Sequence, residues 1–274
     1  MLFPEASREE SLSKIARSAS GEYWQSLEIS ILRKDGDIRI ALWNSANILD
    51  RDGTTLVATI AQGQDITDRK QAEEGLAASY EKLRRALSGT VQALSATVET
   101  RDPYTCGHQR RVVHLAGAIS QEMKLSQEQV EGMQALGLLH DIGKVAVPAE
   151  ILSKPGKLSE MEFNLIKAHP QAGYDILKDI EFPWPIALPV LQHHERLDGS
   201  GYPQGLTGPD ILLEARILAV ADVVEAMASH RPYRPALGID QALEEISQNR
   251  GVLYDPEVVD VCVKLFTEKT FQFD

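Results

Sequence analysis

Strand-like alternation of apolar and polar residues is confined to one short region of this chain, residues 22–67. Its period-two runs cover 27–31, 38–43 and 56–60, and Asp/Gly turns at 35–37 and 50–53 separate them. Such runs joined by such turns predict an antiparallel meander of about three strands. Only one short helical pattern, within residues 5–20, precedes them, so this sheet looks incomplete as a domain.

Residues 101–274 have the patterns of helices instead. The helical segments are 110–124, 126–140, 158–167, 171–179, 212–229, 239–249 and 257–268. Ser126 and Gln129 have the spacing of a capping box at the start of the second segment. Because strands do not alternate with these helices, the pattern argues against an α/β sheet and a mainly α fold is predicted.

Residues 68–100 form a linking stretch without proline. Its apolar residues are spaced 4-3-4-4-3-4, namely Leu76, Tyr80, Leu83, Leu87, Val91, Leu94 and Val98. The mean step of about 3.67 residues is that of an eleven-residue repeat more than a heptad. One interpretation is the buried face of an ordinary amphipathic helix. The favoured one is a short parallel stalk that makes the protein a homodimer and links an input domain to an output domain.

Composition limits the partners and the compartment. The 274 residues suffice for one large or two smaller domains, and a net charge of −12 argues against a DNA, RNA or anionic-membrane binder. The two cysteines, Cys106 and Cys262, lie far apart, which excludes a disulfide scaffold or a zinc ribbon. Without a signal sequence or an apolar span, the expected location is the cytoplasm.

Histidines provide the chemical signal. His140-Asp141-Ile142-Gly143-Lys144 taken alone would more often be a buried structural pair. A second segment, His193-His194-Glu195 followed by the glycine-rich loop that contains Gly201-Tyr202-Pro203, changes that judgement. Imidazoles and carboxylates are costly to bury without a partner, so two such segments indicate a functional site.

These segments resemble the HD-GYP domain, a subgroup of the HD-superfamily phosphohydrolases, over residues 101–265. His140-Asp141 stands at the HD position and Gly201-Tyr202-Pro203 at the GYP position. The strands of residues 1–67, with the exit Asp65-Ile66-Thr67-Asp68-Arg69-Lys70, resemble the C-terminal part of a PAS sensor domain. The resemblances imply a partial PAS domain at 1–67, a helical linker at 68–100 and an HD-superfamily helical bundle at 101–274 that hydrolyses cyclic di-GMP.

The resemblance also implies a site with two divalent metal ions, iron or manganese, and a set of ligands. The implied ligands are His108, His140, Asp141, His169, His193, His194 and Asp222. Asp141 would bridge an ion held by His108, His140 and Asp222 and another held by His169, His193 and His194. Some family members bind a third metal through a glutamate where this chain has Tyr104, so two ions are favoured.

Other residues are assigned to catalysis and substrate. Asp141 and Lys144 are the expected catalytic residues, and Lys144 would also bind a phosphate of the substrate. The remaining expected substrate contacts are Arg231, Arg234, Gly201, Tyr202 and Pro203. The chain departs from the usual family residues at Leu197, Glu225 and His230, and none of these is expected to touch a ligand. His114 and Cys106 are expected to be ordinary structural residues.

Three functions remain open at this stage. The favoured one is a phosphodiesterase that converts cyclic di-GMP to linear pGpG, with GMP left open as a further product. The first alternative is an HD-type phosphohydrolase acting on another cyclic dinucleotide or on a nucleotide. The second is a non-catalytic module that senses cyclic di-GMP or binds signalling proteins through its GYP surface.

Overall fold

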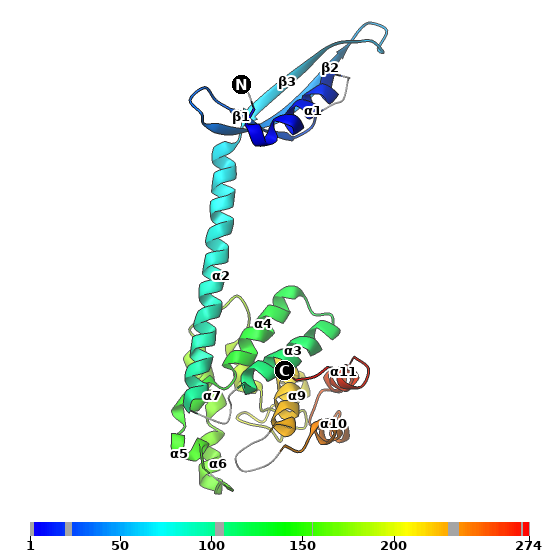
Figure 1. The fold of residues 1–274 in the computed structure, drawn as a ribbon. Coiled ribbons are helices and arrows are strands. Elements are labelled where there is room, and N and C mark those ends of the chain that lie inside the picture. The colour runs from blue at the N-terminus through cyan, green and yellow to red at the C-terminus, as the bar shows by residue number, and fades with distance from the viewer. Residues whose placement is uncertain are drawn as a thin grey trace. The chain divides into compact units, whose positions relative to one another are not determined.

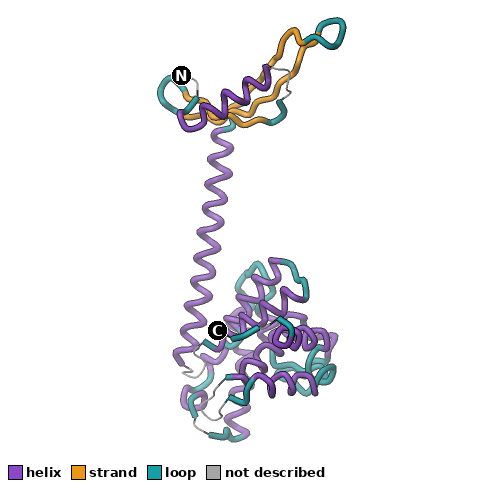
Figure 2. The backbone as a smooth tube through the Cα atoms, turned by 45° about the vertical axis from the view of Figure 1, so that its right-hand side comes forward, coloured by secondary structure: helices purple, strands orange, loops and turns teal. Residues whose placement is uncertain are grey.

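The structure is a computed structural model that describes residues 3–19, 24–101, 107–154, 156–229, 236–269 and 271–273. The chain divides into two compact units, Met1–Arg85 and Ala86–Asp274. As predicted, the chain is mainly helical and has a small antiparallel sheet near its N-terminus (Figures 1 and 2). The further division at residues 67 and 100 stays a prediction. Among the described residues, no helix has an apolar run long enough to cross a membrane.

The first unit contains a three-stranded sheet. A short 3-10 helix η1 (Glu5–Ser7) and helix α1 (Arg8–Ala19) precede strands β1 (Leu27–Leu32), β2 (Ile38–Leu49) and β3 (Leu56–Asp65). The order is β1-β2-β3 and both pairings are antiparallel, which confirms the predicted meander. β2 and β3 extend beyond the predicted runs because their pairing continues through Trp43 and Gly63. A Cβ on Gly63 would lie 2.8 Å from the Trp43 ring, so the indole lies directly over the glycine.

Helix α2 (Thr67–Arg101) follows the sheet and confirms the predicted helix over the linking stretch. Its apolar stripe has two different environments. Leu76, Tyr80 and Leu83 are 73%, 66% and 69% exposed, whereas Val91 and Val98 are buried in the core of the second unit. Val91 and Val98 are therefore on the buried face of an amphipathic helix, whereas Leu94 is 39% exposed and Leu76, Tyr80 and Leu83 remain exposed to a partner chain.

The second unit is helical throughout its described regular elements. After α2 come α3 (His108–Glu122), α4 (Gln127–Leu139), η2 (Ile142–Ala146), α5 (Ala149–Leu152), α6 (Glu160–Ile166), α7 (His169–Leu177), α8 (Ala187–Gln192), η3 (Gly208–Asp210), α9 (Leu213–Ala228), α10 (Ile239–Gln248) and α11 (Pro256–Thr267). α9 packs against α3, α10 and α11, and its buried Ile217, Leu218 and Val224 lie in the main core. α4 and α8 also contact α9, so the helices next to His108, His140 and His193 all meet it.

The predicted helices are present with small shifts at their ends. Ser126 caps α4 and forms the predicted capping box with Gln129. The helical patterns in the sequence do not include α8, because prolines precede it and Pro189 lies within it. Pro189 is tolerated there because the first N–H groups of a helix have no acceptor within the helix.

Candidate metal centre

Six of the seven predicted ligands lie in two groups in the second unit. His108, His140 and Asp222 form one group, and His169, His193 and His194 form the other. In each group, one ligand atom of every residue lies within 4.8 Å of the others. The family resemblance implied that these two sets hold separate ions. That these residues bind metal stays a prediction, but the fold brings them together.

Asp141 lies between the two groups. Its Oδ2 is 3.4 Å from His140 Nε2 and its Oδ1 is 3.4 Å from His169 Nε2, so each oxygen faces one group. Burial alone would raise the pKa of Asp141, but the charges of Lys144 and the neighbouring imidazoles hold this pKa well below its usual value. A carboxylate that stays ionised and presents one oxygen to each group has the geometry required of a bridging ligand.

Helix ends position most of these side chains. His108 and His169 are the first residues of α3 and α7, and His140 and His193 directly follow the last residues of α4 and α8. Gly143 allows the backbone after Asp141 to approach α7 closely. A Cβ on Gly143 would lie 1.9 Å from the carbonyl oxygen of His169. The glycine of the His140–Lys144 motif is therefore needed to bring the two groups together.

Backbone hydrogen bonds orient three of the imidazoles. Nδ1 of His140, His169 and His193 lies 2.7, 2.7 and 2.6 Å from the carbonyl oxygen three residues earlier in the chain. Since a carbonyl only accepts, each Nδ1 carries the proton and donates it. Each Nε2 then has a lone pair directed into the site, which is the form in which histidine binds metal.

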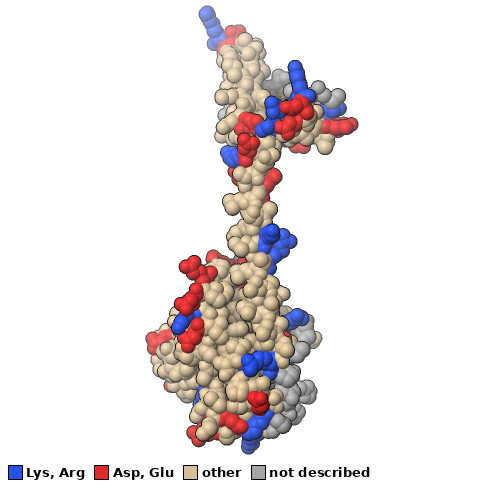
Figure 3. Space-filling model, turned by 90° about the vertical axis from the view of Figure 1, so that its left-hand side faces the viewer, with Lys and Arg blue, Asp and Glu red and all other residues tan. Residues whose placement is uncertain are grey.

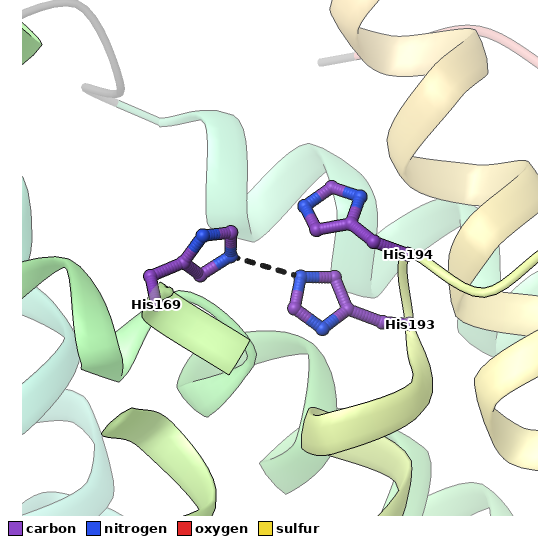
Figure 4. A group of neighbouring side chains, drawn as sticks. All are labelled: His169, His193 and His194. Carbon is purple, nitrogen blue, oxygen red and sulfur yellow. Dashed lines mark hydrogen bonds between the residues drawn. The ribbon is translucent and has the colours of Figure 1, made fainter. Parts of the chain in front are cut away.

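These lone pairs lack protein donors. His140 Nε2 is buried without a hydrogen-bond partner among the described residues. Nε2 of His169 faces Nε2 of His193 (dashed line in Figure 4). The two atoms are 3.2 Å apart, although neither carries a proton in this tautomer. Burial lowers the pKa of His169 to about 4 and that of His194 to about 3, so both imidazoles are uncharged near pH 7 and each keeps a nitrogen lone pair. A divalent cation is the group that this donor set fits.

His108 is oriented differently, and the prediction for Glu225 was wrong. Glu225 is fully buried and hydrogen-bonds Nδ1 of His108, while Nε2 of the same ring lies 3.3 Å from Oδ1 of Asp222. Burial opposes the charged imidazole, yet the hydrogen bonds to Asp222 and Glu225 raise the pKa of His108 to about 9. Glu225 is three residues after Asp222 on α9, and that spacing on one helix face is the signal that could have identified it.

The GYP loop is held by Glu195. This residue is 2% exposed, and its two carboxylate oxygens accept the backbone N–H groups of Gln204 at 2.7 Å and Leu206 at 3.0 Å. Gly201 passes so close to Glu195 that a Cβ would lie 2.4 Å from its Cα. Tyr202 then stacks on His194 with the ring centres 4.8 Å apart. The sequence noted the acid but did not indicate its role in the loop.

A cavity of about 370 Å³ opens onto both groups. Its polar lining is His108, Asp141, Lys144, His169, His194, Tyr202 and Asp222, and its apolar lining is Ile166, Val223, Ala226 and Met227. Nζ of Lys144 donates to Oδ2 of Asp141 at 2.8 Å. The structure thus places the predicted Lys144 and Tyr202 beside the predicted metal ligands.

Some predicted residues lie elsewhere. Gly201, Pro203 and Leu197 do not line the cavity. His114 is exposed and packs on Phe271, with ring centres 4.7 Å apart, in agreement with a structural role. Tyr104, Cys106, His230, Arg231 and Arg234 lie outside the described residues.

Comparison with known proteins identifies the family to which the chain is similar. Residues 92–258 match the family described as HD domain. The chain is 43% identical over 194 residues to Cyclic di-GMP phosphodiesterase response regulator RpfG of Xanthomonas campestris pv. campestris (strain 8004), covering 70% of this chain and 51% of that protein. It is 39% identical over 167 residues to 3'3'-cGAMP-specific phosphodiesterase 3 of Vibrio cholerae, covering 61% of this chain and 36% of that protein.

A solved structure shares the fold. The crystal structure of a cyclic GMP-AMP specific phosphodiesterase of V. cholerae aligns with a TM-score of 0.52 and 19% sequence identity. The alignment covers 67% of this chain and 49% of that one. This chain therefore spans about half the length, or less, of the proteins that it matches.

Proposed function

The chain belongs to the HD domain family, and from this premise we propose that it is a metal-dependent phosphodiesterase that hydrolyses cyclic di-GMP to linear pGpG. The observation that carries the proposal is the arrangement of Asp141 between two groups of mostly buried residues, one of three histidines and one of His108, His140 and Asp222. The name of the relative that is 43% identical over 194 residues supports the choice of substrate. A second step to GMP is left open.

His108, His140 and Asp222 would hold one divalent ion, His169, His193 and His194 the other, and Asp141 would bridge them. Imidazole and carboxylate ligands suit first-row ions, and we propose iron or manganese. When bound, such a pair of ions supplies positive charge that lowers the pKa of water and offsets the charge of a phosphodiester. The Nδ1 hydrogen bonds keep the ligand nitrogens of His140, His169 and His193 directed into the site.

Lys144 and Tyr202 would act on the substrate itself. The ammonium of Lys144 both faces the cavity and donates to Asp141, so it can meet a phosphate oxygen next to the proposed bridging ligand. Burial raises the pKa of Tyr202, so its hydroxyl keeps its proton and can donate to the substrate. We propose that Arg231 and Arg234 bind the second phosphate or a guanine. Gly201 and Pro203 would determine the conformation of the loop.

The remaining proposals concern the partners and the rest of the chain. We propose that the sheet of the first unit is part of a PAS sensor domain and that exposed Leu76, Tyr80 and Leu83 contact a second copy of the chain.

A cytoplasmic location fits the acidic composition and the sparse cysteines. On the face in Figure 3, basic side chains are interspersed with acidic ones, which supports a small anionic substrate over DNA or RNA.

A related cyclic dinucleotide is the second candidate substrate. The Vibrio cholerae relative that is 39% identical over 167 residues carries the name of a 3'3'-cGAMP-specific phosphodiesterase. Both dinucleotides have two phosphodiesters, and the metal ligands around the cavity recognise phosphate rather than a base. The rate of cleavage of 3'3'-cGAMP relative to cyclic di-GMP will decide between the two.

The test is cleavage by the chain loaded anaerobically with Fe²⁺ or Mn²⁺. Chromatography of the products should show linear pGpG, and Asp141→Ala should abolish its formation. If the loaded wild type binds cyclic di-GMP or 3'3'-cGAMP but cleaves neither, the enzyme proposal is wrong. The chain would then be a module that senses a cyclic dinucleotide.

A further inference from the structure

The C-terminal part of α2 has a buried polar contact with the helix that carries His108. Val91 and Val98 of α2 are 5% and 2% exposed and lie in the main core, and Ser95 lies between them on the same face. Ser95 is itself 5% exposed, and its hydroxyl donates to Oε1 of Gln109, which is 1% exposed. Burying two polar side chains costs free energy unless they meet, so this contact favours one register of α2 against α3.

Gln109 directly follows His108 in the first turn of α3. The ring of His108 is held by Glu225 of α9, whereas the start of its helix is held by Ser95 of α2. The place of the His108 ligand nitrogen therefore depends on α2 as well as on α9.

A second contact joins α2 to the segment after Asp141. Nη1 of Arg101, the last residue of α2, donates to the carbonyl oxygen of Val145 at 2.8 Å. Val145 belongs to η2, which begins directly after Asp141 and contains Lys144. The end of α2 thus contacts both the segment of His108 and the segment of Asp141 and Lys144.

We propose that Ser95 and Arg101 are positioning residues through which the register of α2 sets the distance between His108 and Asp141. The inference rests on the proposed two-metal function and adds its regulation. A shift of α2 by one residue is a rotation of about 100° and a translation of about 1.5 Å, which separates Ser95 from Gln109. Such a shift lowers the affinity for the ion assigned to His108, His140 and Asp222. The affinity for the ion assigned to His169, His193 and His194 stays unchanged.

The contact gives the helix a regulatory role. α2 is continuous from Thr67, whose hydroxyl accepts the backbone N–H of Ile40 in the sheet. Whatever alters the register of α2 changes the affinity of one ion, and by linkage that ion favours one register of α2.

The experiment titrates the full chain with Mn²⁺ alone, using calorimetry for the two affinities and electron paramagnetic resonance for the coupled ion pair. Ser95→Ala is expected to weaken the binding of the ion assigned to His108 and to reduce the coupled signal, by less than the about 10- to 100-fold loss typical of residues that hydrogen-bond a metal ligand directly. Ser88→Ala makes the same change at an exposed position of α2 and should match wild type. Unchanged binding in Ser95→Ala, or equal weakening of both ions, would overturn the proposal.

A second variant separates positioning from stability. Arg101 is an exposed side chain, and Arg101→Gln removes its contact to Val145. This variant should weaken Mn²⁺ binding and leave the urea midpoint unchanged. Arg85→Gln, on the same helix, should leave Mn²⁺ binding unchanged. If Mn²⁺ affinity falls only in Ser95→Ala and in proportion to its stability, the role is structural and the proposal is wrong. Wild type that binds fewer than two ions would instead refute the two-metal function on which the proposal rests.

Discussion

His108 and Glu225 form a buried imidazole–carboxylate pair between α3 and α9. Nδ1 of His108 is hydrogen-bonded to Oε2 of Glu225, and Nε2 of the same ring lies 3.3 Å from Oδ1 of Asp222. The other oxygen of Glu225 accepts Nε of Arg111 at 2.7 Å and the hydroxyl of Ser229 at 2.7 Å. Glu225 thereby determines which nitrogen of His108 faces the proposed ion.

Replacing Glu225 tests this relationship. Glu225→Gln keeps the size of the side chain but removes the charge that holds the proton on Nδ1 of His108. We expect Mn²⁺ affinity and activity to fall about 10- to 100-fold, measured as the Mn²⁺ concentration that gives half of the maximal rate. Glu244→Gln, at an exposed position of α10, is the control. An unchanged Mn²⁺ requirement would show that Glu225 does not orient a ligand.

Removing metal should lower stability as well as activity. The buried lone pairs of His140, His169 and His193 have no protein donors among the described residues, so a bound cation stabilises the folded chain. We expect a chelator to lower the thermal midpoint of wild type and Mn²⁺ to restore it. Asp141→Asn should lose most of this response. Equal midpoints of wild type with chelator and with excess Mn²⁺ would contradict the proposed ligands.

Gly143→Ala should be destabilising because its new methyl group meets backbone. The Cβ would lie 1.9 Å from the carbonyl oxygen of His169 and 2.5 Å from the N of Gly173. Overpacking of this kind costs roughly 1–3 kcal/mol, measured by urea unfolding. Gly75→Ala on α2 is the matched control, since nothing lies within 4 Å of its Cβ and alanine favours a helix. Equal stability of the two variants would exclude a close approach at Gly143.

Glu195→Gln should loosen the GYP loop. The carboxylate accepts two backbone N–H groups, whereas an amide can accept only one and turns its NH₂ toward the other. The lost hydrogen bond to a charged acceptor is worth about 1.5–3 kcal/mol. We expect its loss to appear mainly as a higher KM for the cyclic dinucleotide. Exposed Glu257→Gln provides the comparison. A normal KM would mean that Tyr202 is positioned without Glu195.

Glu122 should make stability depend on acid pH. Hydrogen bonds from Lys264 and Lys269 lower the pKa of Glu122 from 4.5 to about 2. Because the folded pKa is depressed, the stabilisation is complete above about pH 4.5 and is lost as the pH falls toward 2. The urea midpoint of Glu122→Gln should therefore lie below that of wild type at pH 7, and the difference should shrink below pH 4.5. A difference that is constant with pH would rule out this ion pair.

Most elements of the fold follow from local patterns. The helix of the linking stretch, the capped start of α4 and the three strands agree with the sequence, because periodicity, caps and turns depend on neighbouring residues. The pairing of β2 and β3 beyond residues 43 and 60 could not be predicted in this way. It depends on the close contact of Trp43 with Gly63, whose positions are far apart along the chain.

The sequence by itself indicated a functional site of histidines and carboxylates, since the His140-Asp141 and His193-His194 segments are visible without coordinates, and its family resemblance implied the set of metal ligands. Only the tertiary structure decided which residues outside the motifs hold the predicted ligands in place: Ser95 of α2 contacts the helix of His108. Glu225 hydrogen-bonds His108 from 117 residues away. The physical reason is that a motif specifies chemical groups, whereas the distance and the protonated nitrogen of each group depend on helices packed from distant parts of the chain.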